Sequence, residues 1–217
     1  MKKQISIARK VIYENIKADI LSSRINEGEK LIEQELAEKY NYSRTPVREA
    51  LLMLQQEGYI TINRNKGAVV KKLSIQKVKI IFETLAILEG KVLEKLNSDN
   101  MSSQHFEYQN TLQKKMEVAA INKEYDQYMD LNFKFHQFFV ERFENECIRQ
   151  ITYDLRQQVY RIVRQGLSLP QHISSYLEDH NNILEAIAKH NFYQAGYIME
   201  SHVMSAGQNI YRTMTQS

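Results

Sequence analysis

The chain has 217 residues, a formal net charge of +3 and a single cysteine, Cys147. One cysteine excludes an intramolecular disulfide, and no stretch approaches the roughly 18 uninterrupted apolar residues of a membrane span, so we expect no membrane partner. Only two prolines and seven glycines, against abundant helix-forming residues, favour a mainly α-helical fold. The Lys2-Lys3 start is not followed by the apolar run of a secretory signal, and we expect a cytoplasmic protein.

Charge is unevenly distributed along the chain. Residues 1–74 carry 14 Lys and Arg against 9 Asp and Glu, whereas residues 75–217 carry 15 against 17. A basic N-terminal part joined to a slightly acidic remainder is typical of nucleic-acid binding by the first part only. Ordinary surface scatter could give the same numbers, so the charge needs support from the elements themselves. We expect two domains, 1–74 and 75–217.

The first 40 residues predict two helices. Apolar residues recur at helical spacing over about 7–23, and the polar Asn26-Glu27-Gly28 segment interrupts the pattern. A second, shorter helix is predicted from Leu31 to Tyr40. Asn41-Tyr42 then forms a turn into a third helix.

The third helix is the most informative segment of the chain. Ser43 or Thr45 can cap its start, and Gly58 ends it. Apolar residues at helical spacing would face a small core, namely Val47, Ala50, Leu51 and Leu54. Arg44 and Arg48 are four residues apart and therefore share one side of the helix. Two arginines and a threonine at the start of a helix favour entry into a DNA major groove, where arginine binds guanine edges or phosphates.

Two β-prone runs, 59–62 and 68–70, follow this helix. The polar, basic segment 63–67 separates them, which predicts a β-hairpin whose tip carries Arg64 and Lys66. A basic hairpin tip is usually only solvated, but directly after a helix-turn-helix it is predicted to contact DNA backbone or minor groove. The order of three helices and a hairpin is that of a winged helix-turn-helix.

Beyond Ser74 the strand signals vanish and helical patterns follow one another. Polar or proline-containing breaks separate six predicted helices, near 75–96, 102–121, 124–143, 145–167, 173–190 and 192–214. Short connections between helices of similar length predict an antiparallel all-α bundle.

Three of the six histidines fall on predicted bundle helices: His136, His180 and His202. Asn132 lies four residues before His136 and therefore projects from the same helix face. Three imidazoles that converge inside a bundle would bind a borderline divalent ion such as Zn or Ni. Spacing alone does not show that they converge, and a buried polar network without a metal is the alternative.

The whole pattern resembles a known family. The segment Ser43-Arg-Thr-Pro-Val-Arg-Glu-Ala-Leu51, with Gly28, Glu33, Leu36-Ala37 and Gly67 around it, is similar to the winged helix-turn-helix of the GntR family of bacterial transcription regulators. The second half resembles the all-helical effector-binding domain of its FadR-like branch, called FCD. With six helices rather than seven, this domain resembles that of the VanR-like subgroup.

The resemblance implies roles for individual residues. The family's DNA-contacting positions fall on Arg44, Thr45 and Arg48, and a further contact position falls on Gln34. The wing glycine falls on Gly67. Metal-binding FCD domains use an aspartate four residues before a histidine, and then two more histidines. These positions correspond to Asn132, His136, His180 and His202, so the resemblance implies a metal, Zn or Ni, with Asn132 as a weak fourth ligand.

Two departures from the family pattern concern the effector. An amide oxygen at Asn132 is neutral, so we expect the metal to keep its full positive charge with no protein anion offsetting it, which favours an anionic metabolite as effector. The family often places an arginine three residues before a Leu-Glu pair, where it binds the effector's carboxylate. Here Leu85 occupies that position. The fourth bundle helix offers three possible substitutes: Arg156, Arg161 and Arg164.

Together these features predict a homodimeric, DNA-binding transcriptional regulator, not an enzyme. Two winged domains would read a palindromic duplex operator, and an organic-acid effector in the metal-containing bundle would change the distance between them. Two alternatives stay open. One is an effector-independent dimeric repressor with a purely structural bundle. The other is a metal-dependent hydrolase, against which no general base is expected beside the histidines, since Glu178 and Asp179 should point away from His180.

Overall fold

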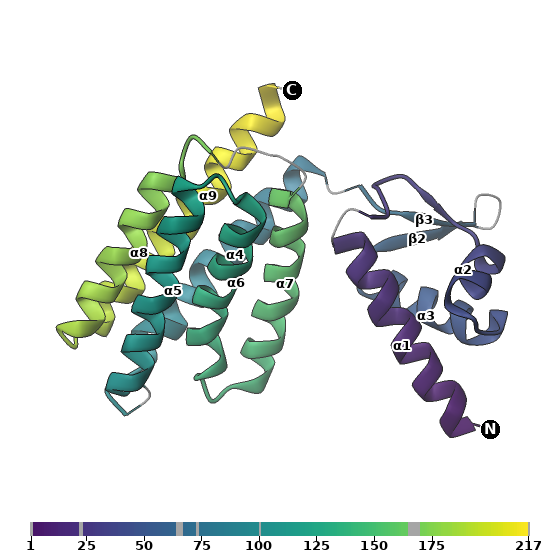
Figure 1. Ribbon diagram of the computed structural model, residues 1–217, viewed down its shortest axis with the longest axis horizontal. Coiled ribbons are helices and arrows are strands. Elements are labelled where there is room, and N and C mark those ends of the chain that lie inside the picture. Colours follow the sequence, from purple (N-terminus) through teal and green to yellow (C-terminus); the bar gives the residue numbers. More distant parts are fainter. Residues whose placement is uncertain are drawn as a thin grey trace. The chain divides into compact units, whose positions relative to one another are not determined.

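The computed structural model describes residues 2–21, 24–63, 67–72, 74–99, 101–164 and 170–216. The chain divides into two compact units, Met1–Leu73 and Ser74–Ser217 (Figure 1). The first unit contains α1 (Lys2–Leu21), β1 (Lys30–Leu31), α2 (Glu33–Tyr40), α3 (Arg44–Gln56), β2 (Ile60–Asn63) and β3 (Gly67–Val70). The second contains α4 (Ile75–Lys95), α5 (Ser103–Ile121), α6 (Tyr125–Glu141), α7 (Glu146–Arg164), α8 (Ile173–Ala188) and α9 (Phe192–Gln216).

The first unit closes around one apolar core. The three helices supply most of it, with side chains at helical spacing such as Ile12, Ile16, Val47 and Leu54, all at 0% exposure. Since each helix presents one apolar stripe, the three stripes pack together and leave the opposite face of α3 exposed. The core is therefore what directs the start of α3 outward.

The sheet of this unit differs from the expected hairpin. Three strands pair in the order β1-β3-β2, and all pairs are antiparallel. Leu31 faces Ala68 across the β1–β3 pair, so the prediction that Leu31 starts a helix is wrong. Helix α2 begins two residues later, at Glu33. A two-residue strand has no periodicity of its own and forms only because β3 supplies its hydrogen bonds.

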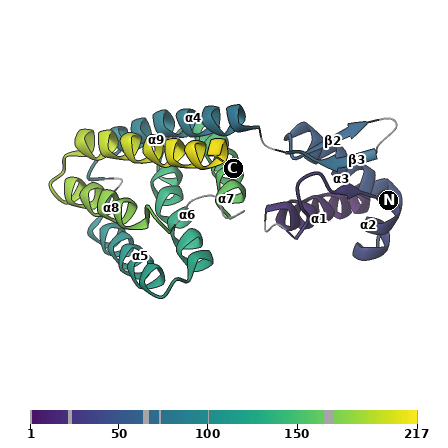
Figure 2. The same ribbon diagram turned by 90° about the horizontal axis from the view of Figure 1, so that it is seen from above.

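The second unit is a bundle of the helices α4 to α9 (Figures 1 and 2). Helix starts are fixed by capping: the Ser74 side chain accepts a hydrogen bond from the Lys77 amide, and Ser102 forms a capping box with His105. These bounds agree with the helices predicted from the sequence to within a few residues at each end. The mainly helical fold is therefore confirmed.

Helices α4 and α9 lie side by side in close contact (Figure 2). A Cβ atom on Gly196 would lie 2.5 Å from the Gly90 carbonyl oxygen, and one on Gly207 would lie 2.4 Å from the Phe82 Cβ. The later residue of α4, Gly90, meets the earlier residue of α9, Gly196, so the two helices are antiparallel. Because these glycines have no side chain, the two helices approach closely, and Gly90, next to Glu89, lies against Glu200 of α9, two residues before His202.

None of the described helices combines the length and apolar character that crossing a membrane requires.

Candidate DNA interface and candidate metal centre

Helix α3 begins after an extended residue and ends at a glycine. Ser43 occupies the N-cap position with an extended backbone, although its hydroxyl makes no capping hydrogen bond. Glycine follows the C-cap, and Gly58 has a φ of +80°. The Tyr59 amide, one residue later, donates to the Leu54 carbonyl at 2.9 Å. This is the αL ending for which glycine is favoured, and it turns the chain directly into β2.

The start of α3 presents the predicted DNA-contacting residues to solvent. Arg44, Thr45 and Arg48 are exposed, with 65% and 64% of the two arginine side chains accessible. Gln34 and Gly67 line the same surface groove as the two arginines. Four of the predicted contact residues, from three separate elements, thus lie around one groove. Arg64 and Lys66, the predicted hairpin contacts, lie outside the described residues.

An acidic residue that the sequence did not single out for a role lies among these side chains. Arg48 donates from Nε and Nη2 to the two carboxylate oxygens of Glu33, at 2.8 and 2.9 Å. Arg44 Nη2 lies 3.5 Å from the same carboxylate. The hydrogen bonds from Arg48 make the largest contribution and Arg44 adds to them, and together they lower the pKa of Glu33, so the residue is ionised. The sequence offered one signal for Glu33: it directly precedes Gln34, a predicted DNA contact, at the start of α2.

In the second unit the structure brings the three predicted histidines together. His136 on α6, His180 on α8 and His202 on α9 are all buried, and one ligand atom from each lies within 4.8 Å of the others. The Nε2 atoms of His180 and His202 are 3.2 Å apart. Two nitrogens bound tetrahedrally to one Zn at about 2.0–2.1 Å would be separated by roughly 3.3 Å. The spacing of this pair therefore fits two ligands of one tetrahedral ion.

One unused ring atom also fits a metal. His136 Nε2 is buried and has no hydrogen-bond partner among the described residues, whereas the unpartnered Nδ1 of His180 cannot bind the same ion as its Nε2, which faces His202. Buried polar atoms are normally paired, so an orphaned imidazole nitrogen inside a histidine cluster indicates a missing partner. Burial lowers the pKa of His136 to about 3 and that of His180 well below its ordinary value. Both rings are therefore neutral, as metal ligation requires.

His202 has a carboxylate behind it. Its Nδ1 lies 3.1 Å from Asp179 Oδ2. A proton on Nδ1 then donates to Asp179 and leaves the Nε2 lone pair directed at His180. The expectation that no carboxylate of this pair lies beside the histidines is wrong for Asp179, which contacts the ring on the next helix.

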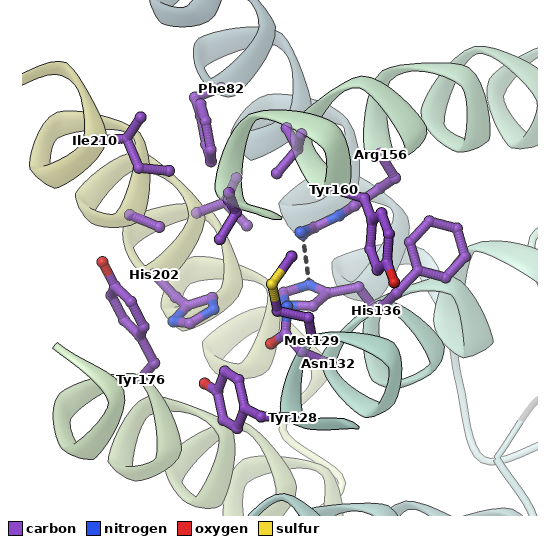
Figure 3. A pocket seen from close by; sticks show the side chains of 15 residues that line it. Phe82, Tyr128, Met129, Asn132, His136, Arg156, Tyr160, Tyr176, His202 and Ile210 are labelled. Atoms are coloured by element: carbon purple, nitrogen blue, oxygen red, sulfur yellow. Dashed lines mark hydrogen bonds between the residues drawn. The ribbon is translucent and has the colours of Figure 1, made fainter. Parts of the chain in front are cut away.

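His136 has a second carboxylate behind it, Glu89 from α4. His136 Nδ1 lies 2.8 Å from Glu89 Oε2, and Arg156 from α7 donates to both oxygens of Glu89. Burial raises the pKa of Glu89, but Arg156 and His136 outweigh it and lower the pKa to about 2. Arg156 Nη2 also lies 2.6 Å from Nδ1 (Figure 3). Of the two tautomers possible there, the one with Nδ1 protonated towards Glu89 leaves Nε2 free for a metal.

These carboxylates change the expected charge of the site. The sequence predicted a metal with no protein anion near it. Glu89 and Asp179 are both within hydrogen-bond distance of histidine ligand candidates, and Arg156 balances one of them. The surroundings of the three rings therefore carry a net charge of about −1, and the preference for an anionic effector has to come from the adjoining pocket instead.

That pocket adjoins His136 and His202 (Figure 3). Arg156, 5% exposed, and Asn132, half-buried, both line it. Three tyrosines line it as well, and the remaining wall is apolar: Phe82, Met129, Phe133, Val159, Val163, Val203, Ala206 and Ile210. Leu85 is fully buried in the core. The structure does not describe the side chains of Arg161 and Arg164, the other expected effector contacts.

Comparison with known proteins identifies the family. Residues 8–70 match the model of bacterial regulatory proteins of the gntR family, and residues 80–205 match that of the FCD domain. The chain belongs to the GntR family of transcriptional regulators. The chain is 25% identical over 199 residues to the HTH-type transcriptional repressor RspR of Escherichia coli K12, covering 92% of this chain and 87% of that protein.

Other relatives agree with this assignment. The gluconate operon transcriptional repressor of Bacillus subtilis is 28% identical over 179 residues, which cover 81% of this chain and 70% of the relative. Among solved structures, E. coli McbR/YncC matches with a TM-score of 0.78 at 19% identity over 96% of this chain and 98% of the other. A GntR regulator from Pseudomonas syringae pv. tomato matches with a TM-score of 0.56 at 22% identity, over 98% and 89%. These two likenesses show the fold.

The family membership confirms the predicted function class. The GntR chain is a transcriptional regulator with an effector-binding FCD domain, and its family and relatives are regulators rather than enzymes. The hydrolase alternative is thereby set aside. The three-histidine cluster occupies the FCD domain, some members of which bind metal.

Proposed function

We propose that a homodimer of this chain binds a palindromic duplex operator through the start of α3, and that a metal and an anionic effector in the second unit control this binding. The observation that carries the DNA part is the exposed row of Arg44, Thr45 and Arg48 on a helix whose other face is buried. Gln34 and Gly67 lie around the same groove, and Arg64 and Lys66 extend the proposed contacts onto the wing. A regulator of chromosomal DNA acts in the cytoplasm.

Arg48→Ala tests the DNA interface. A duplex is first selected by the wild-type protein from a random-sequence pool. Pairing of an arginine with a guanine contributes about 1–3 kcal/mol of discrimination. We expect the variant to bind this duplex roughly 5- to 150-fold more weakly. Arg9→Ala is the matched control, because Arg9 is an exposed arginine of the same unit that pairs with Glu49 outside the groove. Equal binding by Arg48→Ala and wild type would refute the interface.

For the second unit, we propose that His136, His180 and His202 hold a divalent ion, Zn or Ni, through ring nitrogens, with Asn132 as a neutral fourth ligand. The buried, unpartnered Nε2 of His136 supports this assignment. When bound, the ion would supply a Lewis-acidic position for an effector oxygen. The protein's own residues orient the rings: Glu89 holds His136 and Asp179 holds His202, each through Nδ1.

Elemental analysis of purified variants tests the metal. We expect His180→Ala and His202→Ala to lose the bound ion, because each removes one of three ligands. His172→Ala, a histidine at the start of α8 outside the cluster, should retain it. Wild-type stoichiometry in the two cluster variants would contradict the site.

The effector we propose is a carboxylate with an apolar body. Arg156 lines the pocket, and although Glu89 balances its charge, its Nη1 donors are not used by Glu89 and can bind a carboxylate. We propose Arg161 and Arg164 as further contacts from α7, and eight apolar side chains form much of the pocket wall. A polyol acid such as gluconate, the compound in the names of two relatives, would leave several hydroxyl groups against this wall without hydrogen-bond partners. An effector-independent repressor remains the alternative, and it predicts that no metal and no acid stabilises the second unit.

A further inference from the structure

The two arginines at the start of α3 share one acidic partner, Glu33. The carboxylate receives two parallel hydrogen bonds from Arg48, at 2.8 and 2.9 Å, and lies 3.5 Å from Arg44 Nη2. Paired bonds of this kind fix the plane of the guanidinium as well as its position. Arg48 would otherwise be a long, flexible side chain, since 64% of it is exposed.

The remaining donors of Arg48 point to a use for this arrangement. A guanidinium has five N–H groups, and Glu33 takes one from Nε and one from Nη2. Three are left, and two of them, one of Nη1 and the second of Nη2, form the outer edge of the fork. That edge presents two parallel donors, which is the pattern that guanine O6 and N7 accept in the major groove.

Glu33 itself is held in place by its element. It is the first residue of α2, where the helix N-terminus favours a negative charge. The same helix turns Leu36 and Ala37 into the core, so the backbone beneath Glu33 is anchored. Only 24% of its side chain is exposed, against 64% for Arg48. The acidic partner is thus the fixed side of the pair.

We propose that Glu33 is a positioning residue for sequence recognition: it holds the outer edge of Arg48 for pairing with a guanine, and its charge opposes unspecific contacts of Arg44 and Arg48 with phosphate. The proposal rests on the proposed function, since it assumes that α3 enters the major groove. It assigns to a non-contacting carboxylate the discrimination between operator and other DNA.

The two effects of Glu33 act in opposite directions on two kinds of DNA. For the operator, loss of the carboxylate frees Arg48, and the entropy of ordering it again weakens the guanine contact. For unrelated DNA, loss of a negative charge beside two arginines strengthens the attraction to phosphate. A residue that only stabilised the fold would change both affinities in the same direction.

The test compares Glu33→Gln with Glu35→Gln in the full-length protein. Glu35 lies on the same helix, is exposed and is absent from the groove, so its variant makes the same change in net charge. Binding is measured to three kinds of duplex of one length. They are the duplex selected by wild type, a series in which each half-site G·C pair of that duplex is replaced in turn by A·T, and an unrelated sequence. Thermal melting checks that the variants fold, and an exposed ion pair contributes little to it.

We expect Glu33→Gln to lower the ratio of operator to unrelated affinity roughly tenfold, with unrelated DNA bound at least as tightly as by wild type. Arg48→Ala identifies the G·C pair that Arg48 contacts, because replacing that pair no longer weakens binding by this variant. We expect Glu33→Gln to lose discrimination at the same pair. An unchanged ratio, or a result equal to that of Glu35→Gln, would overturn the role of Glu33 and leave the DNA interface intact. If Arg48→Ala also bound like wild type, the proposed function itself would fail.

Discussion

Two carboxylates, rather than the three histidines alone, give the candidate metal centre its character. Asp179 on α8 and Glu89 on α4 each lie behind one ring, at 3.1 and 2.8 Å from its Nδ1. A carboxylate in this position fixes the tautomer and raises the basicity of the ligating nitrogen. Glu89 is also the partner of a buried arginine, so its removal would leave that charge unpaired. Asp179 is the cleaner residue to change.

We predict that Asp179→Asn weakens Zn binding by about 10- to 100-fold while the protein still folds. The amide is close in shape to the carboxylate but cannot hold the Nδ1 proton of His202 as strongly. Affinity is measured by competition with a chelator of known strength. Glu178→Gln, a change of the same charge at the exposed neighbouring position, should bind Zn as wild type does. Equal affinities for both variants would show that Asp179 does not orient the ring.

The sequence located the residues of this site better than their contacts. His136, His180 and His202 fell on the correct helices, but only the family resemblance indicated that they converge. Asp179 was misjudged because neighbours on a helix point about 100° apart, and the geometry of one helix does not reveal which ring lies on the next. The contacts of Glu89 with His136 and Arg156 span 47 and 67 residues, beyond any spacing rule.

Among the elements, the junction of α1 and α2 is held by one buried carboxylate, Asp19. Asp19 accepts hydrogen bonds from Arg24 at 2.7 Å, from Lys39 at 2.7 Å and from Tyr40 at 2.9 Å. Burial raises the pKa of Asp19, but the bonds from Lys39, Tyr40 and Arg24 outweigh it, so the net pKa is lowered. The charged form is therefore the one that stabilises the folded state.

This shift predicts a pH dependence of stability. Above the pKa of the unfolded aspartate, about 3.9, both states are ionised and the contribution is complete. As the pH falls below that value, the unfolded chain takes up the proton first, and the contribution is lost towards the lower folded pKa. Asp19→Asn should therefore cost about 1–3 kcal/mol at pH 7, and the gap to wild type should narrow near pH 3. Unfolding followed by circular dichroism measures the gap, and a gap independent of pH would contradict the assignment.

The elements that the sequence predicted were those with a long apolar period. Helices α3 to α9 each present a stripe over several turns, and strands β2 and β3 alternate around a recognisable turn. Strand β1 was missed because its two residues, Lys30 and Leu31, carry no periodic signal and depend on pairing with β3. A hydrophobic pattern in the sequence identifies a helix or strand only when the apolar residues that stabilise it recur at a regular spacing.

At the scale of the whole molecule, the basic first unit and the slightly acidic second unit correspond to two tasks. The two arginines on the DNA face share one carboxylate, Glu33, in the free protein. The second unit has buried histidines beside a pocket with an arginine and an apolar wall. If both ligands act on one dimer, linkage requires that effector and operator change each other's affinity by the same factor.

The most direct test of this account is the affinity for the selected duplex, measured with Zn-loaded protein in the presence and absence of a carboxylate with an apolar body, hexanoate or benzoate. We predict that the acid weakens DNA binding by wild type, that gluconate does so less, and that neither affects His202→Ala. An acid effect of equal size in wild type and His202→Ala, or no effect on wild type, would contradict the control of DNA binding by the histidine site.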